Sequence, residues 1–129
     1  MKYTELKAKH REEWNAFPIA FAFNKEQLSE GLRKLGVTKE EVVGVQGGGF
    51  IRKTDEQKFF DLFLRQFEET EKHTLDDTFL LDAIKYELAN HEFCVTYDPI
   101  PALDAIGVSL DDERVKNLYS IALKHYHQQ

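Results

Sequence analysis

The residues with the clearest chemical potential lie near the middle of the chain, at Glu87 and His91. Four residues separate them, so in a helix they lie on the same face, one turn apart. A carboxylate and an imidazole on one face can hold a metal ion or transfer a proton. His10, on the apolar stripe of another expected helix, could join them. These three residues are therefore the candidates for a catalytic site.

The same residues also have an ordinary structural interpretation. His91 and Glu92 do not reproduce the His-Glu-x-x-His zinc motif, in which two histidines share a helix face. Buried Glu and His side chains commonly satisfy backbone groups or cap strand ends. The sequence therefore assigns no catalytic, cofactor-binding or metal-binding residue, and Glu87, His91 and His10 stay candidates only.

Cys94 is a further residue with possible chemistry. It would act as a nucleophile only as a thiolate, which needs a nearby cation or helix N-terminus. It lies between Phe93 and Val95 in an aromatic and β-branched run, where a cysteine usually serves as a small apolar side chain. We favour that structural role. Glu92 and Asp98 complete the metal-ligand types in this stretch.

Three consecutive glycines, residues 47–49, are followed by Lys53-Thr54 and so suggest a phosphate-binding loop. That loop requires Gly-Lys-Ser/Thr without a gap, directly between a strand and a helix. Here Phe-Ile-Arg intervenes before Lys53. Glycines can instead supply the positive φ angles of a hairpin turn. We favour a hairpin over 42–53, with a helix followed by a loop as the alternative.

Residues 103–121 superficially resemble a helix-turn-helix motif, because residues 106–109 match the usual turn. The second helix would then present Asp111, Asp112 and Glu113 to DNA phosphates, where Lys and Arg are needed. Acidic residues instead suit the first turn of an ordinary helix. The sequence therefore argues against DNA reading by this motif.

The chain is expected to be organised around a helix over 75–90 that runs into a strand over 93–97. The apolar residues of the helix spread over more than half of its circumference at about 100° per residue, which favours burial on most sides. Glu87 falls inside this apolar arc, so it should be buried and hydrogen-bonded. Its possible partners are Arg52, a histidine or the backbone of residues 47–49. The side chains expected to be almost inaccessible are Phe79, Leu80, Ala83 and Ile84.

Periodicity and capping signals predict the other elements. The further helices are expected over 3–17, 25–35, 55–72 and 110–126, with one or two helical turns over 102–106 and a buried strand over 19–23. Their expected N-caps are Asn24, Thr54 and Ser109, and Thr74 with Asp77 is expected to cap the central helix. Gly36 and Gly107 are expected to end the helical segments that precede them. The prediction is an α+β fold with about five helices around a small, mainly antiparallel sheet of three or four short strands, in a single domain over 1–129.

The composition argues against anionic partners. Seventeen Lys and Arg against 23 Asp and Glu give a net charge of −6, which disfavours nucleic acid and anionic membranes. A single cysteine fits a reducing cytosol. The sequence lacks an apolar signal core and any apolar run of about 18 residues. We expect a cytoplasmic protein without a cofactor, with another protein as its partner.

Three sequence blocks resemble a known family. They are Trp14-Asn15-Ala16-Phe17-Pro18 leading into residues 21–23, the segment 47–53, and Tyr86-Glu87-Leu88-Ala89-Asn90-His91-Glu92-Phe93-Cys94. They are similar to small uncharacterised proteins of Gram-positive gut bacteria and their phages or mobile elements. The resemblance spans roughly residues 10 to 110. It implies a cytosolic, phage-linked setting and no mechanism, because no activity is established for that family.

Two classes of function follow from the sequence. The first is a small non-catalytic protein that binds a host protein, since no complete catalytic motif is present. The second is a metal-dependent or acid/base hydrolase that uses Glu87 and His91, with His10 as a third group. Convergence of these side chains in an open cleft would favour the enzyme, and a closed core would argue against it.

Overall fold

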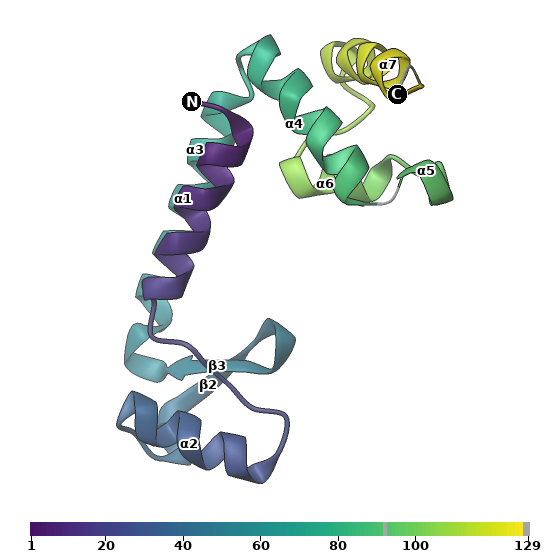
Figure 1. Cartoon of the computed structure of the whole chain (residues 1–129). Coiled ribbons are helices and arrows are strands. Elements are labelled where there is room, and N and C mark those ends of the chain that lie inside the picture. The colour runs from purple at the N-terminus through teal and green to yellow at the C-terminus, as the bar shows by residue number, and fades with distance from the viewer. Residues whose placement is uncertain (92, 128–129) are drawn as a thin grey trace. The chain divides into compact units, whose positions relative to one another are not determined.

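The computed structural model describes residues 1–91 and 93–127, with side chains for all of these except 94, 95 and 125–127 (Figure 1). The chain divides into two compact units. The first contains residues 1–9 and 67–129, and the second contains residues 10–66. Helix α1 (Tyr3–Ala16) and helix α3 (Glu56–His73) each contribute residues to both units.

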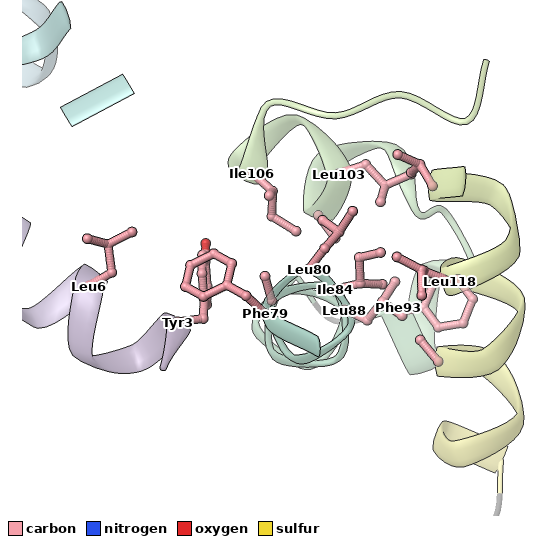
Figure 2. Packing of buried hydrophobic residues seen from close by; sticks show 14 residues of the cluster. Tyr3, Leu6, Phe79, Leu80, Ile84, Leu88, Phe93, Leu103, Ile106 and Leu118 are labelled. Atoms are coloured by element: carbon pink, nitrogen blue, oxygen red, sulfur yellow. The ribbon is translucent and has the colours of Figure 1, made fainter. Parts of the chain in front are cut away.

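The first unit is helical and is built around α4 (Asp77–Asn90), as the sequence predicted. Helices α6 (Ile100–Ile106) and α7 (Glu113–His127) pack against α4. Figure 2 shows apolar side chains of these three helices meeting around α4. The four side chains expected to be inaccessible are all buried, namely Phe79, Leu80, Ala83 and Ile84. The short helix α5 (Phe93–Thr96) completes this unit.

The central helix begins later than predicted, and a different residue caps it. The Asp76 carboxylate accepts hydrogen bonds from the backbone N–H groups of Thr78 and Phe79. Thr74 and Asp77, the expected capping pair, are instead both contacted by the Arg114 guanidinium of α7, through the Thr74 carbonyl and the Asp77 carboxylate. A chain with several Asp and Thr residues near a helix start offers competing caps, and here Asp76 forms the cap.

The predicted strand over 93–97 is wrong, because these residues form α5. The backbone N–H of Tyr97 donates to the Phe93 carbonyl at 2.8 Å and closes a helical turn. Phe93 is buried and packs edge to face with Tyr119 of α7, with 6.4 Å between ring centroids. A strand needs a neighbour for its backbone groups. The unit around α4 provides helices instead, so packing overrides the β propensity of this run.

The end of α6 and the start of α7 follow the predicted pattern in part. Gly107 ends α6 in the left-handed conformation, as expected. Ser109 was predicted to cap the last helix. Its hydroxyl instead accepts from the N–H of Asp111 in a turn, and α7 begins only after Asp112, whose carboxylate accepts from the N–H of Arg114.

The second unit contains a three-stranded antiparallel sheet in the order β1-β3-β2. The strands are β1 (Ala20–Phe21), β2 (Val42–Val45) and β3 (Gly49–Arg52). The predicted hairpin over 42–53 is confirmed, with Val43 paired to Ile51. The turn uses positive φ at Gly47 and Gly48 only, since Gly49 is extended at −84°. The strand expected over 19–23 is shorter than predicted.

Helix α2 (Lys25–Leu35) covers one face of this sheet. Asn24 caps it by accepting from the N–H of Gln27, and Gly36 ends it in the left-handed conformation, both as predicted. Before β2 lie a Thr38–Glu41 capping box and the 3₁₀ turn η1 (Lys39–Glu41). The buried side chains between α2 and the sheet are Ala20, Leu35 and Phe50. Helices around a small antiparallel sheet confirm the α+β class.

Gly31 is the point of closest approach between α2 and the sheet. A Cβ atom at this position would lie 2.5 Å from the Phe50 ring and 2.9 Å from the Ala20 Cβ atom. Alanine normally stabilises a helix relative to glycine by about 1 kcal/mol. We expect Gly31→Ala to lower the free energy of unfolding by about 1–3 kcal/mol, because overpacking outweighs that gain. Chemical denaturation measures this, with the exposed α2 substitution Ser29→Ala as the control. A stabilised Gly31→Ala protein would contradict the packing.

Helix α3 follows β3 through the 3₁₀ turn η3 (Lys53–Asp55), which takes the place of the expected Thr54 cap. Asp55 is buried, and its carboxylate accepts a hydrogen bond from the Arg52 guanidinium at 2.7 Å. This pair links the last residue of β3 to the turn that precedes α3. Three large apolar residues of α3 within this unit remain more than half exposed, namely Phe60, Phe63 and Leu64.

Candidate functional site

Glu87 occupies the position that its sequence pattern predicted. Its side chain is fully buried, with 0% exposure, on the face of α4 that packs into the core of the first unit. The neighbouring water face of α4 carries residues 78, 82 and 89, all exposed. A buried carboxylate is costly unless it is paired, so the partners of Glu87 decide what it can do.

Four polar side chains surround the Glu87 carboxylate. The Tyr3 hydroxyl and the Lys7 ammonium, both from α1, each donate to Oε1 at 2.6 Å. Asn90 Nδ2 donates to Oε2 at 3.3 Å, and His91 Nε2 lies 3.1 Å from the same oxygen. The predicted histidine partner is thus present. Because both carboxylate oxygens are engaged, Glu87 fastens the first turns of α1 to α4.

The partners of Glu87 also determine its charge state. Burial alone would raise the pKa of Glu87, but the hydrogen bonds from Lys7 and Tyr3 and the Lys7 charge outweigh it and hold this pKa below its usual value. Burial, followed by the hydrogen bond to Glu87, raises the pKa of Tyr3 far above its usual value. Glu87 is therefore a carboxylate and Tyr3 a neutral donor at neutral pH.

The remaining candidates are distributed over the chain. His91 is half-buried beside Glu87, whereas His10 belongs to the second unit, where its backbone carbonyl accepts a hydrogen bond from Gln66. Asp98 is exposed and accepts a hydrogen bond from the backbone N–H of Ile100. Glu92 and the side chain of Cys94 lie outside the described residues. Among the residues whose side chains the structure describes, no three His, Cys, Asp or Glu side chains gather in a way that could hold a metal ion.

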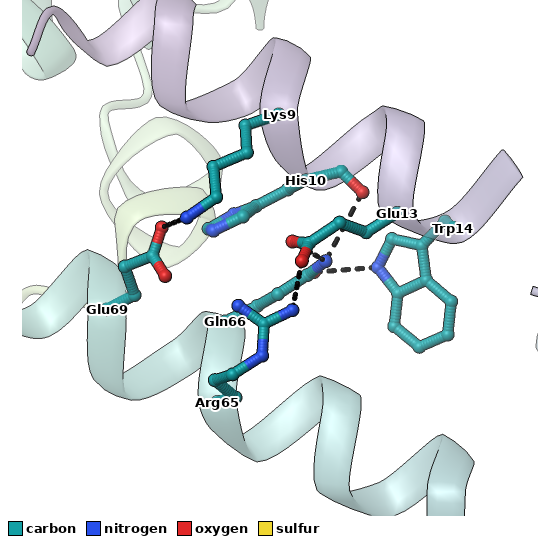
Figure 3. Close-up of polar contacts among 7 residues, drawn as sticks. All are labelled: Lys9, His10, Glu13, Trp14, Arg65, Gln66 and Glu69. Atoms are coloured by element: carbon teal, nitrogen blue, oxygen red, sulfur yellow. Dashed lines mark hydrogen bonds and ion pairs between the residues drawn. The ribbon is translucent and has the colours of Figure 1, made fainter. Parts of the chain in front are cut away.

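Polar contacts between α1 and α3 are drawn in Figure 3. In the second unit, Gln66 is buried, and its carbonyl oxygen accepts from the Trp14 indole at 2.7 Å. Its amide nitrogen donates to Glu13 at 3.2 Å, and Arg65 also binds the Glu13 carboxylate. In the first unit, Lys9 binds Glu69 at 2.8 Å. These contacts hold each pair of helix segments together.

The second unit contains an open apolar groove that sequence reasoning did not find. Its volume is about 690 Å³, and it lies between the β2–β3 hairpin and the first turns of α3. The floor includes buried Ile51, and Phe59 stacks obliquely on Trp14, with 5.1 Å between ring centroids. Phe60 and Phe63, which line the groove, are 58% and 57% exposed.

The groove is apolar and almost uncharged. The only charged residue among those that line it is Glu56, and Val43, Val45 and Gln46 form the side that belongs to the hairpin. The whole second unit carries nine Lys and Arg and nine Asp and Glu, so its formal net charge is zero. The excess acidic charge of the chain therefore lies in the first unit. Large exposed aromatic residues in a neutral groove are typical of a protein-binding surface.

The chain matches the model of a protein family described as Family of unknown function (DUF7659) over residues 2–125. The chain belongs to this family. The match to DUF7659 includes every residue of the groove and of the Glu87 cluster. No curated protein and no solved structure matches the chain. In the described part of this DUF7659 member, none of the helices is long and apolar enough to cross a membrane.

Proposed function

We propose that this protein binds another protein and performs no chemistry by itself, with the groove between β2–β3 and α3 as its binding surface. One observation carries the proposal. The groove exposes more than half of each of two Phe side chains, Phe60 and Phe63, in a unit with no net charge. Exposed aromatic side chains gain free energy when a partner removes them from water.

The packing of the aromatic residues beside the groove also supports this proposal. Trp14, Phe17 and Phe59 pack against one another at tilted and edge-to-face angles, with ring centroids 5.1–5.9 Å apart. Gln66 holds the Trp14 indole, and the Arg52–Asp55 pair fixes the start of α3. The aromatic groups beside the groove therefore keep their positions when no partner is bound, which lowers the entropy cost of binding.

The contacts of Glu87 support a structural role for this catalytic candidate. A general base must reach a substrate proton, but both oxygens of Glu87 already accept hydrogen bonds inside the core. One observation favours the alternative hydrolase: half-buried His91 lies 3.1 Å from the Glu87 carboxylate. Such a contact can orient an imidazole for proton transfer.

The proposal also includes the cellular location and the type of partner that the sequence suggests. The single cysteine supports a cytoplasmic location, and the sequence resemblance supports a role in phages or mobile elements that act on a host protein. The acidic helix ends of the first unit, such as residues 68–71 and 111–113, would steer a basic partner electrostatically.

The test is affinity purification of tagged protein from the organism that encodes it. We expect Phe63→Glu to reduce recovery of the partner by at least about tenfold, because a charge would be buried against apolar side chains. Lys58→Gln is the matched control: it lies on the same helix, is exposed, lines no part of the groove, and changes the charge by the same amount.

The hydrolase alternative is tested in the same organism, with variants of the gene that encodes the protein. If His91→Gln abolishes the phenotype of the gene while thermal stability and partner recovery are unchanged, the hydrolase replaces the binding protein. Equal recovery of the partner by Phe63→Glu and by the unmodified protein would show that the groove is not the binding surface.

A further inference from the structure

Glu56 brings a carboxylate to the apolar groove. Glu56, Phe60 and Phe63 follow one another along α3 at spacings of four and three residues. These spacings place the three side chains on one face of the helix, on successive turns. All three side chains are exposed, and all three line the groove. The α3 side of the groove therefore presents one carboxylate followed by two phenyl rings.

The Glu56 carboxylate is available to a ligand. Arg52, four residues earlier, binds the Asp55 carboxylate at 2.7 Å instead. Among the described residues, no ion pair or hydrogen bond occupies the carboxylate of Glu56. A glutamate in the first turn of a helix also complements the helix dipole, and Glu26 has the same position in α2, away from the groove. Glu56 differs from Glu26 in its place beside exposed aromatic rings.

A cation bound by Glu56 would also lie near Phe60. Side chains four residues apart on a helix have Cβ atoms about 5–6 Å from each other. A cation is attracted to the face of an aromatic ring within about 6 Å of its centroid. Arginine suits this pair best, because its planar guanidinium can donate two hydrogen bonds to a carboxylate and can also stack on a ring. Beyond Phe60, the groove is apolar, with Phe63, Val45 and Ile51 in its lining.

Resting on the proposed function, we infer that the groove binds a short segment of the partner protein in which an arginine adjoins apolar residues. The guanidinium binds Glu56 and stacks on Phe60, and the apolar side chains cover Phe63, Val43 and Val45. The groove volume of about 690 Å³ lies in the range of ligand pockets, so it accommodates a few side chains. The net charge of −6 on the chain attracts such a cationic segment from a distance.

Selection of random peptides displayed on phage tests this inference. The full chain is immobilised as the target, and phage that bind the Phe63→Glu protein are removed beforehand. We expect the retained sequences to be enriched in arginine next to aromatic or branched aliphatic residues. A retained peptide is then synthesised with a fluorescent label, so that fluorescence anisotropy gives its dissociation constant.

A double-mutant cycle assigns the arginine of the peptide to Glu56. Citrulline in place of this arginine removes the charge and keeps the shape, and should raise the dissociation constant for the wild type about five- to tenfold. For Glu56→Gln the same replacement should raise it less than about twofold, because the carboxylate is gone. Glu26→Gln is the matched control, since Glu26 is also exposed in the first turn of a helix, and this protein should behave as the wild type does. Circular dichroism confirms that each variant is folded.

Three results would overturn the inference. The first is a selection that retains no peptide, or only peptides without arginine. The second is a citrulline effect that is the same for the wild type and for Glu56→Gln. The third is a dimer of this chain, detected by sedimentation, that Phe63→Glu dissociates, because a second copy would then occupy the groove.

Recovery of the partner from the native organism tests the proposed function separately. If Phe63→Glu reduces recovery and Glu56→Gln does not, the groove remains the binding surface and the arginine contact is overturned. If peptide binding depends on Glu56 while Phe63→Glu leaves recovery unchanged, the preference of the groove for arginine is supported and the host-binding function is overturned.

Discussion

Replacing Leu80 with alanine is expected to lower the free energy of unfolding by about 2–5 kcal/mol. Leu80 has no exposed surface and lies on α4 among apolar side chains from α6 and α7 (Figure 2). The substitution removes buried methyl groups and leaves a cavity that packed helices on several sides cannot fill. Its cost therefore combines a lost transfer free energy with lost packing contacts.

Urea unfolding followed by circular dichroism measures this loss. Tryptophan fluorescence alone is unsuitable, because Trp14 belongs to the second unit. Leu75→Ala is the matched control, since Leu75 is 76% exposed and should cost less than about 0.5 kcal/mol. A loss below about 1 kcal/mol for Leu80→Ala would mean that α4 is not the centre of its unit.

The features that the sequence predicted well depend on local periodicity. The apolar arc of α4 and the place of Glu87 within it follow from a repeat of 3.6 residues, and the structure confirms both. The α2 boundaries follow from Asn24 and Gly36, whose roles are local to the helix ends. The hairpin required only glycines that tolerate positive φ, and Gly47 and Gly48 supply it.

The errors arose where tertiary packing decides between local alternatives. The run 93–97 has a strong strand propensity, but Phe93 is buried in a helical unit and forms a helical turn there. Phe59, Phe60 and Phe63 recur at helical spacing, but such periodicity does not indicate how much of that helix face is covered. Only the structure shows that Phe59 stacks on Trp14 while the other two stay half exposed beside a groove.

In the candidate site, too, the sequence predicted the local feature and missed the contacts that depend on tertiary packing. The sequence predicted that Glu87 is buried and needs partners, because an unpaired buried carboxylate is costly. It did not identify Tyr3 and Lys7, which lie 84 and 80 residues away along the chain. Such long-range pairs leave no signal in the periodicity of one sequence. The geometry gives Glu87, still a candidate catalytic group, a structural role as a group that joins two helices.

Replacing Glu87 with glutamine should lower the free energy of unfolding by about 2–4 kcal/mol at neutral pH. Glutamine has nearly the same shape, so the change tests charge and hydrogen bonding rather than volume. An amide oxygen accepts weaker hydrogen bonds from Lys7 and Tyr3 than a carboxylate oxygen does. The amide NH₂ group is itself a donor and would face the donors that now surround the carboxylate. Lys7 is about a third exposed, so its ammonium can regain water. The expected loss is therefore below that for a fully buried pair.

Stability should also depend on pH through Glu87. Its pKa is lower in the folded chain than in the unfolded chain, so the unfolded state binds more protons at acidic pH. The stabilisation by Glu87 is then complete above the unfolded pKa of about 4.3 and is lost as the pH falls through the lower folded pKa. Urea titrations between about pH 7 and pH 3 should show this acid-dependent component in the wild type and lack it in Glu87→Gln.

Glu69→Gln distinguishes the buried pair from an ordinary surface pair. Glu69 also binds a lysine of α1, Lys9, but both side chains are partly exposed. Such pairs contribute about 0–1 kcal/mol. The Glu87 cluster does not hold α1 on α4 if Glu87→Gln lowers the free energy of unfolding no more than Glu69→Gln does. The same conclusion follows if the Glu87→Gln and Glu69→Gln proteins both lose stability with acid as the wild type does. The contact between Glu87 and His91 would then need a functional explanation, which the His91→Gln phenotype tests directly.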